Sequence, residues 1–537
     1  MKITYLGHAG FCVETPSTLI IMDPWLSKSG AFDSAWFQYP QNHHLADYVR
    51  DLIKTSKKDK YIYISHEHQD HFDINFLKSL ESSEITFVLA DFVHPVVKNI
   101  IIKNNCPYKK IISLKDNEEL HFKDGLLTLF VLDMELDCDS AILVKTQSRT
   151  FLNLNDCKIH ERLSKIAKKY GPIDIFAAQF SGAVWHPTCY VMDEKTYRII
   201  CLNKNKRKFE IIAKALEIVK PTLYIPSAGP PCFLDPMLFP INFQEVNTYP
   251  RAPQLIENLN KHFRKKKLAT QWPEVMPGDI LDAEQFKFTY LAPNRIKDDN
   301  FQEYIQSYAK QYEDFFEKRS IENSKVDPKQ TFINLKQELL KKLSRIQLIR
   351  KNIPIPLYFS LSDYKDEIYR IDFQKNTITI TTEIAETNNF YSIQTPAWQI
   401  NKVITGELKW PDFALTFRAT LQRVPDVYNT LMHGFVTLEE ESLERFCKLF
   451  YEIFSKKERI NVVCKGKTYS VLRYCPHQGG DLLHAWTEDS LLVCPRHQWK
   501  FDLENHGRCR YNDADIDAIC LSDLKRKNAS SDQQSED

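Results

Sequence analysis

Two short cysteine–histidine pairs near the C-terminus have the residue types that hold an iron–sulfur cluster. Cys475 is separated from His477 by one residue. Cys494 is separated from His497 by two, and sixteen residues lie between the two pairs. Thiolates can bind one iron of a [2Fe–2S] cluster while imidazoles bind the other, which raises the reduction potential above that of an all-cysteine cluster and suits one-electron transfer. Zinc, which accepts the same ligand types, is the alternative.

The residues that flank these pairs favour the cluster over zinc. Gln-Gly-Gly follows His477 and Gln-Trp follows His497. In this respect the segment resembles the Rieske [2Fe–2S] domains of oxygenases and their ferredoxins. Neither loop carries the extra cysteine that forms a disulfide in respiratory-chain Rieske proteins. We therefore expect an all-β Rieske domain whose cluster ligands are Cys475, His477, Cys494 and His497.

A second group of potential metal ligands lies in the N-terminal part of the chain. The apolar run at 61–65 predicts a buried strand, and the segment His66-Glu-His-Gln-Asp-His71 follows it at once. Ligands on one strand-to-helix turn can converge on a single point, as metal binding requires. The pattern resembles the metallo-β-lactamase fold, an αββα sandwich, and that resemblance adds a carboxylate after the strand ending at 155. The predicted catalytic metal ligands are His66, His68, Asp70, His71 and Asp156.

Two imidazoles that the metallo-β-lactamase fold normally supplies are missing. At the first place the chain has the acidic segment 132–139, and at the second it has Pro226-Ser-Ala-Gly229. Their absence argues against an ordinary dizinc hydrolase. The remaining ligands suit one non-haem iron held by two histidines and a carboxylate with open positions. A carboxylate-rich pair of irons is equally compatible with them.

Length, charge and cysteine usage bound the class of protein. With 537 residues the chain exceeds the roughly 250–300 residues of a single core, so several domains are expected. A formal net charge of +1 gives no basis for binding nucleic acid or a membrane surface. The chain enters a predicted strand at once, which leaves no room for a secretory signal, and no apolar run reaches the roughly 18 residues of a membrane span. The scattered cysteines fit the reducing cytoplasm.

The pattern of strands, helices and charged stretches predicts an α+β multidomain protein. Short apolar strands dominate the N-terminal half, charged helical repeats follow, and strands return before the Rieske segment. The last residues are polar and are predicted to be disordered. The expected divisions are an αββα metallo-β-lactamase-like catalytic domain at 1–247, a charged helical connector at 248–345, an α+β accessory domain at 346–437, the all-β Rieske domain at 438–524 and a tail at 525–537.

Five further residues are candidates for contact with a substrate, and the three that lie outside the basic run are also candidates for support of the metal ligands. His8 follows the first predicted strand, Asp139 ends the acidic segment described above, and His186 lies in a loop of small residues. The basic run 204–208 is of a kind that usually forms a solvated face. It also offers charge for a phosphate, so Lys206 and Arg207 are included.

Beyond the two metal motifs, the chain resembles the CMP-N-acetylneuraminate hydroxylase family. The likeness extends over most of residues 1–435. In the vertebrate hydroxylase the Rieske unit precedes the lactamase-like part, whereas here it follows. Electron transfer depends on proximity in space and not on chain order, so the permutation bears on the substrate more than on the mechanism. The segments that carry the resemblance are 3–9, 23–26, 64–71, 155–157 and 421–428.

This resemblance implies a Rieske-dependent monooxygenase. An electron-donor protein, either cytochrome b5-like or a ferredoxin or flavin reductase that uses NAD(P)H, would reduce the cluster, and the cluster would pass electrons to the non-haem iron that activates O2. The implied reaction hydroxylates the N-acetyl methyl group of CMP-N-acetylneuraminate and yields CMP-N-glycolylneuraminate. The permuted order leaves another N-acyl sugar nucleotide, amide or amine open as the small-molecule substrate.

Two other classes of function remain as alternatives. A zinc-dependent hydrolase would use the same histidines and aspartates to activate water, but it would leave the Rieske domain without a role. An O2-reducing protein similar to flavodiiron enzymes would need a flavin module, and none is evident in the sequence.

Overall fold

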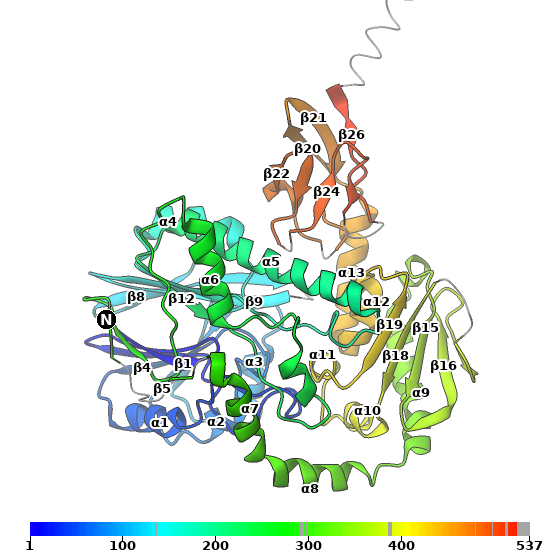
Figure 1. Ribbon diagram of the computed structural model, residues 1–537, viewed down its shortest axis with the longest axis horizontal. Coiled ribbons are helices and arrows are strands. Elements are labelled where there is room, and N and C mark those ends of the chain that lie inside the picture. Colours follow the sequence, from blue (N-terminus) through cyan, green and yellow to red (C-terminus); the bar gives the residue numbers. More distant parts are fainter. Residues whose placement is uncertain are drawn as a thin grey trace, which may run out of the picture. The chain divides into compact units, whose positions relative to one another are not determined.

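A computed structural model gives the fold of the protein and describes residues 1–134, 137–289, 295–296, 298–384, 389–477, 479–496, 498–510 and 514–522. The chain forms two compact units, coloured by sequence in Figure 1. The first comprises Met1–Lys325 and Asp412–Arg418, and the second comprises Val326–Pro411 and Ala419–Asp537. The predicted ligand His497 and the predicted tail at 525–537 lie outside the described residues. Within the described ranges, no helix is long and apolar enough to cross a membrane.

An eight-stranded mixed sheet forms one layer of the first unit. Its order is β14-β13-β1-β2-β3-β4-β5-β6. Strands β3 to β6 are parallel, so their C-terminal ends lie at the same edge. The predicted strand before His66 is confirmed as β4. The strands are β1 (Lys2–Gly7), β2 (Gly10–Glu14), β3 (Thr18–Met22), β4 (Asp59–Ile64), β5 (Ile85–Ala90), β6 (Lys110–Leu114), β13 (Ile280–Asp282) and β14 (Lys287–Thr289).

A six-stranded sheet packs face to face against the first. Its order is β12-β11-β10-β9-β8-β7. Apolar side chains of both sheets, among them Phe11 and Ile20 from one and Leu129 and Ile142 from the other, form a shared buried core. Successive residues along each strand point to opposite faces of its sheet. One face contributes to this core between the sheets, and the other contributes to a core under the helices. The strands are β7 (Glu119–Phe122), β8 (Gly125–Met134), β9 (Asp137–Thr146), β10 (Thr150–Asn153), β11 (Ile175–Gln179) and β12 (Leu223–Ser227).

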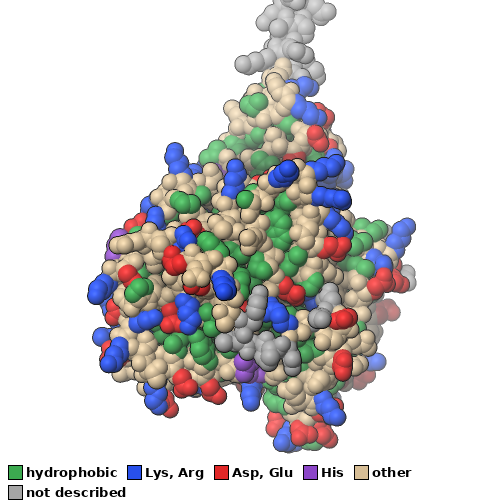
Figure 2. All heavy atoms as spheres, turned by 60° about the vertical axis from the view of Figure 1, so that its left-hand side comes forward, with side chains coloured by type: hydrophobic (Ala, Val, Ile, Leu, Met, Phe, Trp, Pro, Cys, Tyr) green, Lys and Arg blue, Asp and Glu red, His purple; other side chains and the backbone are tan. Residues whose placement is uncertain are grey.

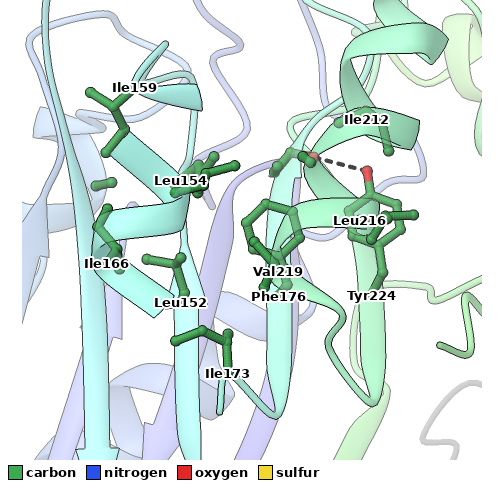
Figure 3. Close-up of a cluster of buried hydrophobic side chains, with 14 of the residues drawn as sticks. Leu152, Leu154, Ile159, Ile166, Ile173, Phe176, Ile212, Leu216, Val219 and Tyr224 are labelled. Atoms are coloured by element: carbon green, nitrogen blue, oxygen red, sulfur yellow. Dashed lines mark hydrogen bonds between the residues drawn. The ribbon is translucent and has the colours of Figure 1, made fainter. Parts of the chain in front are cut away.

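Helices cover the outer faces of both sheets. The helices α1 (Leu45–Thr55), α2 (Ile74–Lys78) and α3 (Val96–Lys103) pack on the first sheet. On the second sheet, α4 (Leu163–Tyr170), α5 (Glu194–Val219) and α6 (Ala252–Phe263) pack through a buried cluster, and Figure 3 shows Leu152 and Leu154 of this layer with Ile166 of α4 and Leu216 of α5. The predicted αββα sandwich is therefore confirmed.

The residues predicted to form a helical connector, 248–345, contribute to both units. In the first unit, β13 and β14 complete the eight-stranded sheet, and α7 (Phe301–Lys310) and α8 (Glu313–Asn323) pack with Phe37 and Cys232 in a small apolar cluster. In the second unit, α9 (Pro328–Arg345) stacks its Phe332 ring on Tyr369 with ring centroids 4.0 Å apart. The charged sequence reflects exposed helix faces.

The second unit contains an α+β part and an all-β part. A five-stranded sheet in the order β17-β16-β15-β18-β19 forms the first of these, with α9, α10 (Ala397–Ile404), α12 (Thr430–Thr437) and α13 (Glu440–Ser455). Helix α11 (Trp410–Leu415) begins in this unit. The strands are β15 (Leu357–Leu361), β16 (Tyr364–Asp372), β17 (Thr377–Thr381), β18 (Phe390–Thr395) and β19 (Thr420–Val424).

The all-β part consists of two small sheets around one core. Their orders are β20-β21-β26 and β22-β23-β24-β25. Tyr469, Val471, Leu492, Phe501 and Ile516 are buried between them. Figure 2 shows one face of the whole molecule, on which basic and acidic side chains are interspersed; the formal net charge of the chain is +1. The strands are β20 (Arg459–Cys464), β21 (Lys467–Leu472), β22 (Trp486–Glu488), β23 (Leu491–Val493), β24 (Lys500–Asp502), β25 (Arg508–Cys509) and β26 (Ile519–Cys520).

Candidate metal centres

Polar residues at the ends of several strands meet at one edge of the sandwich. His8 follows β1, Asp23 follows β3, the loop 65–73 follows β4, and Asp156 follows β10. Because β3 and β4 are parallel neighbours, Asp23 and the loop after β4 leave the sheet side by side. His8 and Asp23 adopt left-handed backbone conformations, with φ of 50° and 39°. Such conformations are uncommon for residues with a side chain and are frequent at functional sites.

Among the residues that the structure describes, two groups of side chains at this edge are arranged as metal ligands. In the first group, Asp70 Oδ2 lies 3.1 Å from His8 Nε2 and 3.9 Å from His71 Nε2. In the second group, which also contains His66, His71 Nε2 lies 3.5 Å from Asp156 Oδ1. The ligand atoms of each group all lie within 4.8 Å of one another. Since both groups contain His71, they are parts of one centre.

Buried hydrogen bonds orient the imidazole of His71. Its Nδ1 donates to Asp23 Oδ2 over 2.8 Å. The Asp23 carboxylate also accepts from the backbone N–H of Ser65 (2.8 Å) and from the Ser65 hydroxyl (2.6 Å). With Nδ1 engaged by Asp23, His71 Nε2 faces Asp70 and Asp156, where it can share a proton with the carboxylates or offer its lone pair to a metal ion. A carboxylate behind a histidine in this way is the usual support of a metal ligand.

The charges of the centre fit a bound cation. Four carboxylates lie in it, and among the described residues their ion pairs are all with imidazoles. Asp70 Oδ1, Asp156 Oδ1 and His71 Nε2 are buried without a hydrogen-bond partner. Buried carboxylates are strongly unfavourable unless paired. A metal ion between these atoms would satisfy all of them, so the residues present fit one. The four carboxylates are Asp23, Asp70, Asp139 and Asp156.

The pKa values in the centre have the same electrostatic origin. Burial lowers the pKa of the His68 imidazole to about 3, and the neighbouring His66 contributes. For Asp70, burial acts to raise the pKa, but His71 and His8 hold it below its usual value. Burial alone would lower the pKa of His71, yet the carboxylates of Asp156 and Asp70 raise it well above 6.5. The site therefore favours positive charge at the position between these groups.

The structure brings together four of the five ligands predicted in this domain. His66, Asp70, His71 and Asp156 all belong to the two groups. His68 lies beside them, with its Nδ1 2.8 Å from His66 Nε2. Its ring packs near Phe32 (centroids 6.1 Å apart). His68 is thus a neighbour of the centre, and its place in the coordination of a metal remains a prediction.

The structure adds to the sequence interpretation of three nearby residues. His8 was predicted to contact substrate or to support a metal ligand, and it lies within a candidate metal group. Asp139, for which the same two roles were predicted, has Oδ1 3.2 Å from His66 Nδ1, a position that supports that ring. Asp23 received no role, although its position at the end of an apolar strand before Pro24 is a signal of a functional turn. The carboxylate of Asp139 comes from the region in which the usual imidazole is missing.

The remaining candidates for substrate contact lie around α5. Lys204 Nζ donates to the backbone carbonyl of His186 over 2.5 Å. Lys206 is exposed, 3.9 Å from Glu210, and Arg207 donates to the carbonyl of Asn203. The role of these residues in substrate binding remains a prediction.

Lys208, in the same run, is half-buried, and its ammonium group is held by backbone carbonyls. Its Nζ donates to the carbonyls of Gly182 (2.8 Å) and Thr248 (2.6 Å). Burial lowers its pKa to about 7. The basic run is therefore not one uniform charged surface.

The candidate cluster site in the second unit is built from two turns of the same design. The N–H of Gly479 donates to Cys475 O, and the N–H of Cys475 donates to Gly480 O, both over 2.9 Å. Gln498 and Trp499 repeat this pattern around Cys494, at 3.0 and 2.9 Å. Each turn thus holds its cysteine at the same place relative to the backbone.

The two thiols meet in the interior. Cys475 and Cys494 are each 1% exposed and form no disulfide. A Cβ at Gly480 would lie 3.0 Å from Cys494 Sγ, so a side chain there would crowd the thiol. Burial and the adjacent Cys494 raise the pKa of Cys475 well above 9.0. Two enclosed thiols without a disulfide, beside the half-buried His477, fit a [2Fe–2S] cluster, whose irons would stabilise the thiolates.

Comparisons with known families agree with these two sites. A family model for the Rieske [2Fe-2S] domain matches residues 438–518. A family model for the beta-lactamase superfamily domain matches residues 2–131. The metallo-β-lactamase fold and the Rieske domain predicted from the two metal motifs are therefore confirmed. The first match contains both cysteine–histidine pairs, and the second contains the His66–His71 loop.

Similar proteins include iron–sulfur proteins and hydroxylases. A Rieske 2Fe-2S iron–sulfur protein of Mycolicibacterium smegmatis is 26% identical over 534 residues, which cover 95% of this chain and 98% of that protein. Cytidine monophosphate-N-acetylneuraminic acid hydroxylase of Xenopus laevis is 23% identical over 452 residues, or 80% of this chain and 70% of the hydroxylase. The Rieske domain and this similarity support an oxidoreductase of the oxygenase type, with a [2Fe–2S] cluster and non-haem iron as cofactors.

One solved structure among those similar to this chain is CmlA, a diiron beta-hydroxylase from Streptomyces venezuelae. It is 16% identical, with a TM-score of 0.34 and coverage of 54% of each chain.

Proposed function

We propose that this protein is a Rieske-dependent non-haem iron monooxygenase that hydroxylates an N-acyl sugar nucleotide, with CMP-N-acetylneuraminate as the first candidate. The observation that carries the proposal is the presence of two different metal-binding arrangements on one chain. Cys475 and Cys494 are enclosed in a Rieske domain, and a centre rich in carboxylates lies in a metallo-β-lactamase fold. Electron supply and oxygen chemistry are the functions that this combination suits.

In this proposal, residues of both groups hold iron. The two groups accommodate either one ion or two adjacent ions, because His71 belongs to both. When bound, the iron would supply O2 activation and the cluster would supply single electrons. Asp23 holds the His71 ring in place through the Nδ1 atom of that ring. Asp139 does the same for His66. The proposed iron ligands are His8, His66, Asp70, His71 and Asp156, with His68 as an adjacent candidate.

The protein around the centre encloses most of it, and the Asp156 side chain is its partly exposed member. His71 is fully buried, and His66 and Asp70 are 3% and 4% exposed. The Trp25 ring packs edge-on to His8, with centroids 5.4 Å apart. Exclusion of water strengthens the electrostatic interactions in a site and suppresses side reactions. A centre enclosed in this way, with one partly exposed side, is suited to hydroxylation of an unactivated C–H bond.

The stoichiometry of this reaction requires an external electron donor. Hydroxylation consumes O2, two electrons and two protons, inserts one oxygen atom into the substrate and releases the other as water. A [2Fe–2S] cluster carries one electron at a time, so a reductase or a small electron carrier must reduce it repeatedly. We propose a cytoplasmic donor linked to NAD(P)H as this partner.

The substrate proposal derives from the similarity to the Xenopus laevis hydroxylase. It is tested by reducing the purified protein without oxygen, adding CMP-N-acetylneuraminate and then 18O2, and analysing the product by mass spectrometry. We expect the product made by the protein with iron in both sites to contain one labelled oxygen atom. His71→Ala should form no labelled product. Absence of labelled product from CMP-N-acetylneuraminate and from other N-acyl sugar nucleotides would refute the substrate class.

Metal analysis of the same samples separates the alternative class. Iron in excess of two ions per chain is expected, since the cluster itself contains two. Zinc without additional iron, together with hydrolysis in place of oxygen insertion, would assign the lactamase-like domain to a hydrolase.

A further inference from the structure

The segment 421–428 belongs to the second unit and has contacts of its own there. It runs from β19 into a turn that ends at Tyr428. Arg423 pairs with Asp426 across the turn, and the Tyr391 hydroxyl donates to the carbonyl of Val427. These interactions hold the backbone of the turn in place. They therefore also fix the position of the Tyr428 backbone, from which the ring extends.

Tyr428 contacts the predicted cluster ligand His477. Their ring centroids are 4.7 Å apart, and the rings are inclined at 71°. Trp499 stacks on the same imidazole, with centroids 4.2 Å apart and an angle of 9°. Tyr428 and Trp499 also contact each other, with centroids 6.2 Å apart. The imidazole of His477 is therefore covered on one face by the Trp499 ring, and the Tyr428 ring adjoins it from a different part of the second unit.

Thr430 holds the backbone of the loop that carries His477. Its hydroxyl donates to the carbonyl of His477 and lies 3.2 Å from the carbonyl of Pro476. Thr430 is the first residue of α12, and the Asn429 side chain caps this helix by accepting from the N–H of Met432 over 2.9 Å. The position of the Thr430 hydroxyl is thus determined by a capped helix.

Neither residue belongs to the matched Rieske domain, which begins at residue 438. We propose that Tyr428 and Thr430 are positioning residues of the cluster: they fix the imidazole of His477, limit water beside it and thereby set the reduction potential. The proposal rests on the cluster assignment within the proposed function but not on the substrate. It also gives the accessory domain a role, because that domain supplies both side chains.

The direction of the effect follows from charge. Reduction adds one electron to the cluster without making or breaking a bond, so the reduced cluster carries one more negative charge. Water stabilises that charge, and an apolar cover that excludes water therefore favours the oxidised state. Removing the Tyr428 ring should raise the reduction potential. Removing the Thr430 hydroxyl frees the loop that carries His477 and should change the environment of the histidine-bound iron.

Redox titration of the full-length protein, followed through the electron paramagnetic resonance (EPR) signal of the reduced cluster, tests this. Tyr428→Ala is compared with Tyr428→Phe, which keeps the ring, and Thr430→Val with Thr430→Ser, which keeps the hydroxyl. We expect a higher potential in Tyr428→Ala, shifted g-values in Thr430→Val, and values close to the original in the two conservative variants. Iron and sulfide per chain are measured in each sample to confirm a full cluster.

Unchanged potential and g-values in both Tyr428→Ala and Thr430→Val, with the cluster fully loaded, would overturn the proposal, and so would a lowered potential in Tyr428→Ala. If Tyr428→Ala does not retain its cluster, the pair at Thr430 decides alone. The titration needs neither substrate nor turnover. Failure of hydroxylation would therefore leave this result intact, and an unchanged potential would leave the oxygenase proposal intact.

Discussion

The two candidate metal centres are assembled in opposite ways. In the first unit, ligands follow strands that lie far apart in the sequence, from His8 to Asp156, and side-chain hydrogen bonds such as that between Asp23 and His71 orient them. In the second unit, backbone hydrogen bonds within two short turns hold Cys475 and Cys494. A local motif is therefore enough to define the cluster site of the second unit, whereas the centre of the first unit depends on the whole sandwich.

The largest expected effect separates the two centres completely. His71→Ala removes the side chain common to both metal groups of the first unit, so we expect loss of the non-cluster iron and of turnover while the Rieske EPR signal persists. His477→Ala should give the reverse, with the Rieske signal abolished. Iron analysis and EPR of both variants check this. Loss of both metals in either variant would show that the centres are not independent.

A buried ion pair in the first unit allows a test of whether this unit unfolds independently of the second. The Arg418 side chain is fully buried and donates to Asp235 Oδ2 over 2.8 Å through Nε. Arg418→Met should lower the free energy of unfolding of the first unit by about 3–5 kcal/mol, because it leaves the Asp235 carboxylate without its partner. Denaturant unfolding followed by tryptophan fluorescence measures this.

The visible circular dichroism of the cluster reports on the second unit in the same experiment. We expect the cluster transition to stay in place in Arg418→Met. A simultaneous shift of both transitions would contradict two separate units, and a shift below about 1 kcal/mol would mean that the pair contributes no more than an exposed one.

A smaller effect is expected from the support of His71. Asp23→Asn preserves the shape of the side chain but removes its charge and replaces one of its two acceptor oxygens by an amide NH2, so the His71 ring competes with Ser65 for the single oxygen that is left. Loss of such support typically weakens metal affinity by roughly 10–100-fold. Competition with a chelator measures the affinity of the first centre, and the cluster content serves as the internal control. An unaltered affinity would remove Asp23 from the account of the centre.

The smallest effect is expected at the exposed basic residues of α5. Lys206→Glu together with Arg207→Glu should raise the KM for a nucleotide sugar by roughly two- to fivefold with kcat unchanged, since exposed charges contribute little each. The increase should disappear at high salt. A KM that stays the same at low salt would leave the two residues as part of a solvated face.

Much of this architecture could be predicted from the sequence because the signals are local. The apolar run of β4 and the histidines directly after it indicate both a strand and a metal loop, and the spacing of Cys475 and His477 indicates the Rieske turn. The pairing of His71 with Asp23 could not be predicted, because it depends on β3 and β4 being parallel neighbours.

Other features were hidden for the same reason. His8 belongs to a metal group only because β1 ends beside the loop after β4, and its surrounding residues carry no ligand pattern. The segment Asp412–Arg418 belongs to the first unit although its flanking residues belong to the second. Composition and periodicity report on helices and strands, but they do not report which distant segments meet.

In the proposed function, the cluster delivers its electron to the centre around His71. The most direct test reduces the cluster, mixes the protein with O2 and substrate, and follows the Rieske EPR signal by rapid freezing while the product is measured. The account predicts that the signal disappears as hydroxylated product forms, and that in His71→Ala the cluster stays reduced on the same timescale. Oxidation of the cluster at equal rates in both proteins, with no product in either, would contradict it.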